Sequence, residues 1–194
     1  MNSYKRMLEI KTYAVENGIW YEHLFKLLFE ETKLLQFDKN VPIILSEVDP
    51  YHLFFVHKGA VLGFDPHSEN VTRVVLPREM FGLYEYIEGM RVNKISWKSM
   101  GKVSVTGISI TRLFKICDML SMDINCLPLH LSSLEMTGTG LFTNLSLLSL
   151  PDKITLLESS HPRLLIELNW KILASYLHVR PESLSREISR RGGL

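Results

Sequence analysis

The spacing of hydrophobic positions predicts helices at the start of the chain and short strands after them. Residues 4–30 carry apolar side chains at helical spacing, and Gly18 falls where a first helix would end and a second begin. From about residue 32 to residue 109, apolar residues come in short β-rich runs separated by turn residues. Many short, closely spaced strands predict a compact antiparallel barrel or roll. The runs are VPIILSE, HLFFVHKGAVLGF, NVTRVVLP, RVNKISW and KVSVTGIS.

After Ser109 the spacing changes to a heptad. Leucines and one isoleucine follow mostly alternating steps of four and three residues, at positions 120, 124, 127, 131, 134, 141, 145 and 148. This spacing predicts a long helix, from near Cys126 to just before Pro151, that pairs with a second copy of itself. A helix packed on its own core has similar spacing, and that alternative stays open. The Thr-Gly-Thr-Gly stretch at 137–140 predicts a weak point in the helix.

Residues 151–194 have the spacing of a small helical unit. The run DKITLLES predicts a short helix, and LLIEL, after a turn at His161-Pro162, predicts a strand. The remainder, NWKILASYLHVRPESLSREISRR, has the spacing of a helix-turn-helix motif.

Within this motif, Asn169 is placed to cap the first helix and Pro181 to begin the second. Leu184 and Ile188, four residues apart, would point inward from the second helix. Its outward face would then present polar side chains that hydrogen-bond well to base edges and phosphates. These are Glu182, Ser183, Ser185, Arg186 and Arg190.

Composition limits where nucleic acid could bind. The 194-residue chain is 46% hydrophobic and 22% charged, with a net charge of +1, so it can bury a core but is not basic as a whole. A strong affinity for nucleic acid must therefore come from one local face. The segment 180–194 is such a face, because Arg180, Arg186, Arg190 and Arg191 outnumber its two glutamates.

Other chemistry has little support in the sequence. Two cysteines are too few for a disulfide framework, which favours a reduced cytoplasm, and neither a signal peptide nor a membrane span is expected. The seven histidines are scattered without metal-ligand spacing, and no glycine-rich phosphate loop is present. We therefore expect no enzyme activity, no catalytic residue, no metal and no cofactor.

These residues carry a resemblance to the Crp/Fnr family of bacterial transcription regulators. HLFFVHKGAVLGF is similar to the family's strand, Lys-Gly turn and strand, and REMFGLYEY to the segment that enters its phosphate-binding cassette. The resemblance implies an α+β fold made of a cyclic-nucleotide-binding-like antiparallel β-roll, a long dimerisation helix and a helix-turn-helix domain. The implied boundaries are residues 1–109, 110–150 and 151–194.

The C-terminal motif LASYLHVRPESLSREISR resembles the DNA-binding motif of the family. Glu182, Ser185 and Arg186 reproduce the E-x-x-S-R pattern of the Fnr branch. The resemblance implies a homodimer that binds an inverted-repeat operator in double-stranded DNA, with a small-molecule effector and RNA polymerase as further partners. The DNA contacts would come from Arg180, Glu182, Ser183, Ser185, Arg186, Arg190 and Arg191.

The effector pocket departs from the family pattern. Where members that bind cyclic nucleotide have Gly-Glu, this chain has Gly82-Leu83, and their Arg-Ser or Arg-Thr pair falls near Val92-Asn93-Lys94. A buried phosphate would lack a well-placed cation, so cyclic AMP is not expected, and two cysteines cannot supply four thiolates for an iron–sulfur cluster. The effector thus remains unknown. The degenerate cassette would comprise Gly82, Leu83, Arg91, Asn93, Lys94 and Thr137.

Two further departures concern the C-terminal motif. His178 occupies a turn position where the family often has glycine. The printed sequence also ends at Leu194, where relatives continue into a β-hairpin wing, so we expect the domain to lack its wing and to bind DNA weakly. A second reading, that of a dimeric sensor or adaptor whose degenerate motif does not bind DNA, stays open.

Overall fold

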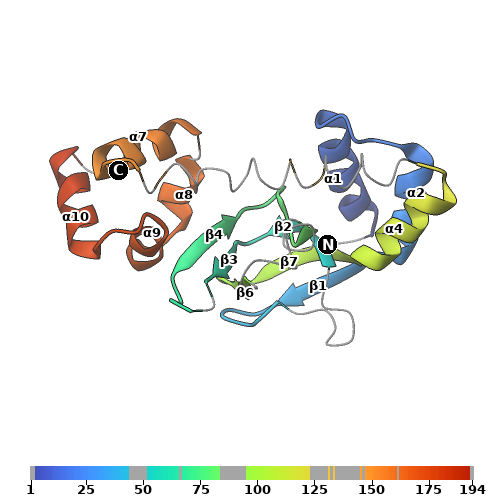
Figure 1. The fold of residues 1–194 in the computed structure, drawn as a ribbon, viewed down its shortest axis with the longest axis horizontal. Coiled ribbons are helices and arrows are strands. Elements are labelled where there is room, and N and C mark those ends of the chain that lie inside the picture. The colour runs from blue at the N-terminus through green and yellow to red at the C-terminus, as the bar shows by residue number, and fades with distance from the viewer. Residues whose placement is uncertain are drawn as a thin grey trace.

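The computed structural model describes residues 3–43, 52–65, 67–83, 95–122, 131, 133, 145, 147–160 and 162–192. Helices stand at both ends of this part of the chain, with antiparallel strands between them (Figure 1). The N-terminal helices are α1 (Ser3–Glu16) and α2 (Glu22–Glu31), and α4 (Ile110–Met119) follows the strands. The strands are β1 (Lys33–Phe37), β2 (His52–Lys58), β3 (Val61–Phe64), β4 (Val71–Val75), β5 (Met80–Phe81), β6 (Ser96–Ser99) and β7 (Val103–Ser109). The C-terminal helices are α7 (Leu150–Ser160), α8 (Pro162–Glu167), α9 (Trp170–Tyr176) and α10 (Pro181–Arg190).

The strands form two antiparallel sheets with a shared core. One sheet has the order β1-β7-β2-β5 and the other the order β4-β3-β6. Period-two alternation directs one face of each sheet inward, so Val56 and Val105 from the first sheet meet Val61 and Val75 from the second. All four side chains are fully buried. The expected antiparallel β structure followed by C-terminal helices is therefore confirmed.

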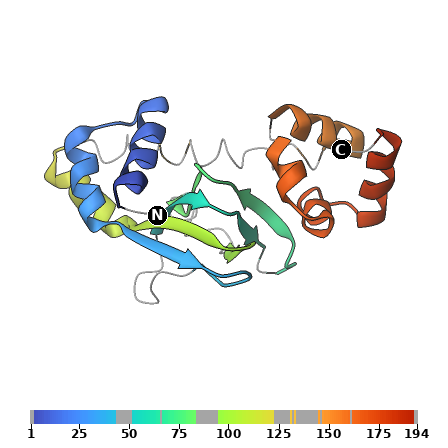
Figure 2. The same cartoon turned by 180° about the vertical axis from the view of Figure 1, so that it is seen from behind.

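Helices cover the two outer faces of the sheets, at opposite ends of the molecule (Figures 1 and 2). The helices α1, α2 and α4 lie over the first sheet, where Leu53, Phe55 and Ile108 join their apolar cluster. The C-terminal helices lie over the second sheet, where Leu62 and Val74 join another. The predicted pair of N-terminal helices is confirmed, and Gly18 between them has a φ of 69°, which glycine adopts without strain.

Two predictions from local pattern are wrong. The LLIEL run is not a strand, because Pro162–Glu167 forms α8, with Leu164 buried and Ile166 exposed. A short apolar run does not distinguish a strand from a helix until its packing partners are known. The helix predicted to run to just before Pro151 also does not reach that point, since residues 147–149 are not helical and α7 begins at Leu150.

Most of the predicted dimerisation helix lies outside the described residues, including Leu127, Leu134 and Leu141. Three of its heptad leucines are described: Leu148 is partly buried in a turn, and Leu131 and Leu145 are buried within the chain itself. Leu131 is 5% exposed in the cluster of the N-terminal helices, and Leu145 is fully buried among the C-terminal helices. These two positions favour the alternative of packing on the chain's own core. The described helices include none that is long and apolar enough to cross a bilayer.

Candidate nucleic-acid interface

The helices α9 and α10 form the predicted helix-turn-helix. The Asn169 side chain caps α9 by accepting a hydrogen bond from the amide of Ile172 at 3.0 Å, and Pro181 stands in the first turn of α10, as predicted. Leu184 and Ile188 bury one face of α10, with 0% and 5% exposure. Local signals in the sequence therefore determine where both helices begin and which way the second one faces.

The turn between the two helices is held by backbone and side-chain hydrogen bonds. The amides of His178 and Val179 donate back to the carbonyls of Ser175 and Ala174, which closes the helix as in a Schellman motif. His178 is the residue with left-handed backbone in this motif, at a φ of 52°, and glycine usually occupies that position. The left-handed backbone of His178 explains why the Crp/Fnr family, which this motif resembles, often has glycine at the position.

Lys153 of α7 supports this turn from beneath. Its side chain is buried, and Nζ donates to the carbonyl of Leu177 at 2.8 Å. Burial lowers the pKa of the Lys153 ammonium group. The free-energy cost of burying this cation is offset by its hydrogen bond to a carbonyl at the C-terminal end of α9, where the helix dipole favours positive charge.

The first helix of the motif is attached directly to the second sheet. Leu173, Ala174 and Tyr176 of α9 are at most 1% exposed and belong to the same apolar cluster as Val74 of β4. The amide of Val71, at the start of β4, donates to the Ser175 hydroxyl at 3.0 Å. The motif is therefore packed directly against the strands of the second sheet. Nothing in the local sequence pattern predicted this contact, which joins segments about a hundred residues apart.

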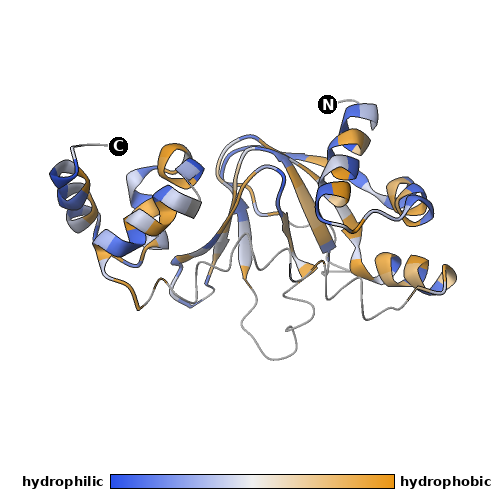
Figure 3. Ribbon diagram, turned by 90° about the horizontal axis from the view of Figure 1, so that it is seen from above, coloured by the Kyte–Doolittle hydropathy of each residue, from blue (hydrophilic) through white to orange (hydrophobic). Residues whose placement is uncertain are grey.

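The outward face of α10 is exposed and polar. Glu182, Ser183, Ser185 and Arg186 are all exposed, as is Arg180 at the N-cap. Figure 3 shows α10 at one extremity of the molecule, coloured mainly as hydrophilic. In the part of the chain that the structure describes, the side chains of Arg180 and Arg186 make no hydrogen bond or ion pair. Both guanidinium groups are therefore available to a partner.

The other two arginines of the segment are held by Glu187. Arg190 makes two hydrogen bonds to this carboxylate, at 2.7 and 2.9 Å, and Arg191 makes one at 3.1 Å. Hydrogen bonds from Arg190 and then Arg191 lower the pKa of Glu187 to about 2. Glutamate three and four residues before an arginine is a recognised helix-stabilising pair, so the sequence contained a signal for this cluster.

Arg191 also connects the end of α10 to α7. Its guanidinium donates to the Glu158 carboxylate and the Thr155 hydroxyl, both at 3.1 Å, and to the carbonyl of Pro151. Its side chain is 23% exposed, against 68% for Arg190. These contacts compete with the phosphate contact expected for Arg191 and give it a positioning role.

Only part of the degenerate cassette lies among the described residues. Leu83 is fully buried in the apolar cluster of the N-terminal helices, so its side chain does not line a polar site. Gly82 has a φ of 105°, and a Cβ there would lie 2.1 Å from the carbonyl oxygen of His52, which only glycine avoids. The remaining predicted pocket residues, Arg91, Asn93, Lys94 and Thr137, lie outside the described residues.

Among the described residues, no group of three or more His, Cys, Asp and Glu side chains is placed to hold a metal ion. No protein-family model matches the chain, and no curated protein matches it in sequence.

Solved structures do match the chain over most of its length. FixK2 from Bradyrhizobium japonicum matches with a TM-score of 0.64 and 16% identity, covering 82% of this chain and 83% of its own. A protein from Eubacterium rectale, described as a transcriptional regulator of the Crp/Fnr family, matches with a TM-score of 0.63 and 13% identity, covering 92% and 87%. CLP from Xanthomonas campestris, described as a c-di-GMP-responsive global regulator, matches with a TM-score of 0.58 and 16% identity, covering 87% and 90%. The chain therefore shares its fold with Crp/Fnr regulators.

Proposed function

We propose that this chain is a homodimeric, DNA-binding transcription regulator of the Crp/Fnr type. The observation that carries the proposal is the exposed face of α10, where the Arg186 side chain has no bonding partner among the described residues while Leu184 and Ile188 bury the opposite face. A guanidinium free in the unbound protein can form two parallel hydrogen bonds with a guanine edge without first breaking an ion pair.

Within each half-site we assign a role to each side chain of this face. Arg186 contacts a guanine, Glu182 accepts from a cytosine amino group, and Ser185 contacts a neighbouring base or phosphate. Arg180 and Arg190 contact phosphates, with Ser183 as a further polar contact. Arg191 holds α10 against α7 and contributes to DNA binding mainly through that geometry.

The division of the chain that we propose has a sensor β-roll at residues 1–109, connecting and dimerisation helices at 110–150, and the DNA-binding unit at 151–194. The dimer is supported by the heptad spacing of its leucines, although Leu131 and Leu145 pack within their own chain. Light scattering should give twice the chain mass of 22.4 kDa. A monomer at micromolar concentration would contradict the dimer.

The effector is not a cyclic nucleotide in this proposal. The site lacks the ribose-binding carboxylate, because Leu83 stands in its place and is buried among apolar side chains. Calorimetry with cyclic AMP and cyclic GMP should therefore detect no binding at physiological concentrations. A micromolar dissociation constant would show that this reading of the cassette is wrong.

The decisive experiment selects fragments bound by the full chain from genomic DNA and maps their protection by footprinting. We expect an inverted repeat whose half-sites lie one DNA turn apart, about 34 Å. On the selected operator, Arg186→Ala should cost about 1 to 3 kcal/mol and relax the preference at one base pair, whereas Arg190→Ala should weaken binding to all sequences alike.

The matched control is Lys115→Ala, which removes one exposed positive charge from α4 at the other end of the molecule. It should leave operator affinity unchanged. If Arg186→Ala changes neither affinity nor base preference, α10 does not read DNA, and the sensor or adaptor reading takes over.

A further inference from the structure

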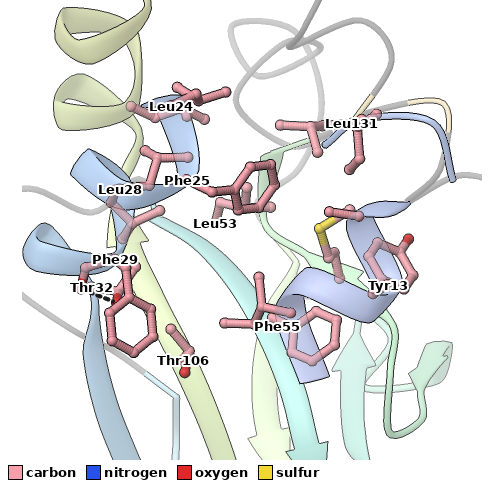
Figure 4. Close-up of a pocket in the computed structure, with 16 residues that line it drawn as sticks. Tyr13, Leu24, Phe25, Leu28, Phe29, Thr32, Leu53, Phe55, Thr106 and Leu131 are labelled. Atoms are coloured by element: carbon pink, nitrogen blue, oxygen red, sulfur yellow. Dashed lines mark hydrogen bonds between the residues drawn. The ribbon is translucent and has the colours of Figure 1, made fainter. Parts of the chain in front are cut away.

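A cavity of about 80 Å³ lies between the N-terminal helices and the outer face of the first sheet. Figure 4 shows side chains of α1, α2 and the sheet strands, with Leu131, arranged around this space. Its aromatic members are Tyr13, Phe25, Phe29 and Phe55. Its aliphatic members include Ala14, Ile19, Leu24, Leu28, Leu53, Met80, Ile108 and Leu113.

The lining carries no charged side chain and few polar atoms. The Thr32 hydroxyl donates to the carbonyl of Phe29 at 2.9 Å, and the Thr106 hydroxyl lies 2.7 Å from Nε2 of His57, so both are engaged. A water molecule in a cavity needs two to four polar partners, which this lining does not offer. A charged ligand would lose its hydration without compensation. The chemistry of the walls therefore selects an uncharged, apolar occupant.

A partly buried polar network joins α1 to the sheet beside the cavity. Glu9 of α1 accepts from Nδ1 of His57 in β2 at 2.7 Å, and the neutral ring then accepts from the hydroxyl of Thr106 in β7. The His57 side chain is only 1% exposed. These directional bonds fix the distance of α1 from the sheet next to the cavity, so the helix is not free to settle into the space.

We propose that this cavity is a binding site for one small, uncharged hydrocarbon-like molecule. None of the described residues that line the cavity was predicted for the cyclic-nucleotide cassette, and the proposal does not depend on DNA binding by α10. An engineered apolar cavity of about 150 Å³ in another protein stays dry and holds benzene or xenon. The present cavity is about half as large, so its occupant must be smaller than benzene. A xenon atom or a short aliphatic chain is therefore the expected occupant.

The test uses the full chain, with xenon and butane as apolar probes and butyrate as the charged counterpart of butane. Titrations followed by NMR of the methyl groups should show saturable shifts confined to residues such as Leu24, Leu28 and Leu131 for the two apolar probes. Butyrate should produce no such shifts, because its carboxylate would be buried without a partner.

The filling variant Ala14→Leu places three extra carbon atoms at the cavity wall, and Ala14→Val adds two if the larger residue prevents folding. Either variant, once shown by circular dichroism to be folded, should bind xenon at least about tenfold more weakly. Leu8→Ala, on the exposed face of α1, is the matched control and should bind as the parent chain does. The proposal is overturned by the absence of saturable shifts with xenon and butane, by equal binding of butyrate, or by unchanged affinity in a folded Ala14 variant.

Discussion

The two groups of helices cover opposite sheets in different ways. The C-terminal group packs closely on its sheet, where Leu173, Leu177 and Leu184 are all fully buried. The N-terminal group, by contrast, leaves a partly open cavity beside equally well-buried residues such as Leu24. A cavity of that size corresponds to about 2 kcal/mol of lost packing at roughly 24 cal/mol per Å³.

The polar bonds across the two interfaces also differ. The C-terminal group is joined to its sheet by the Ser175 hydroxyl, which does not change charge near neutral pH. The N-terminal group is joined to its sheet through the imidazole of His57, a type of group that can take up a proton as the pH falls. Lowering the pH should therefore affect the attachment of the N-terminal group more than that of the C-terminal group.

The largest expected effect comes from truncating one buried leucine at each end. Leu173→Ala should destabilise the chain by about 3 to 5 kcal/mol, because α9 is tightly packed on β4, and should abolish DNA binding with it. Leu24→Ala should cost about 2 to 3 kcal/mol, because its side chain already faces a cavity and loses fewer contacts. Urea denaturation measures the free energy of unfolding of both variants. Equal losses in that free energy would contradict the contrast in packing between the two groups of helices.

A smaller effect is expected from pH. Burial, more than the neighbouring Arg6, lowers the pKa of His57 below 6.5 and outweighs the hydrogen bond and charge of Glu9, which raise it. The unfolded chain therefore takes up this proton first, so the stabilisation present above about pH 6.5 is lost progressively as the pH falls toward the pKa of the folded state.

The measurement compares the free energies of unfolding of the parent chain and of His57→Gln between about pH 7.5 and 5. The advantage of the parent chain should shrink as the pH is lowered. An advantage that stays constant or grows would mean that the folded chain does not hold His57 in its neutral form.

The smallest expected effect concerns the turn of the helix-turn-helix. His178→Gly should stabilise the chain by about 0.5 to 1 kcal/mol, because glycine adopts the φ of 52° without steric cost. His178→Ala retains the Cβ and the strain, so it should not stabilise. Thermal unfolding of the pair separates backbone strain from loss of the imidazole, and equal midpoints for the two variants would argue against strain.

Local signals predicted a large part of this structure. The cap at Asn169, the start of α10 at Pro181 and the inward direction of Leu184 and Ile188 depend on short-range rules, and the structure agrees with each of them. Period-two alternation in the run KVSVTGIS agrees with the burial of Val103 and Val105, although Thr106 is buried as well.

What the sequence did not predict depends on contacts between distant segments. The bond from Val71 to Ser175 and the network from Glu9 to Thr106 each join residues far apart in the chain, and periodicity carries no information on such pairs. The cavity was missed for the same reason, since every residue that lines it has the ordinary pattern of a core position. The assignment of LLIEL to a strand was wrong because a short apolar run fits either a strand or a helix, and here Leu164 and Leu168 pack among the C-terminal helices.

The salt dependence of binding to the selected operator tests the central claim most directly. If the exposed arginines of α10 neutralise phosphates, the logarithm of the association constant should fall linearly with the logarithm of salt concentration, and Arg190→Ala should flatten that slope by about one unit. The same slope in the parent chain and in Arg190→Ala, or binding that does not respond to salt, would contradict DNA recognition by this face.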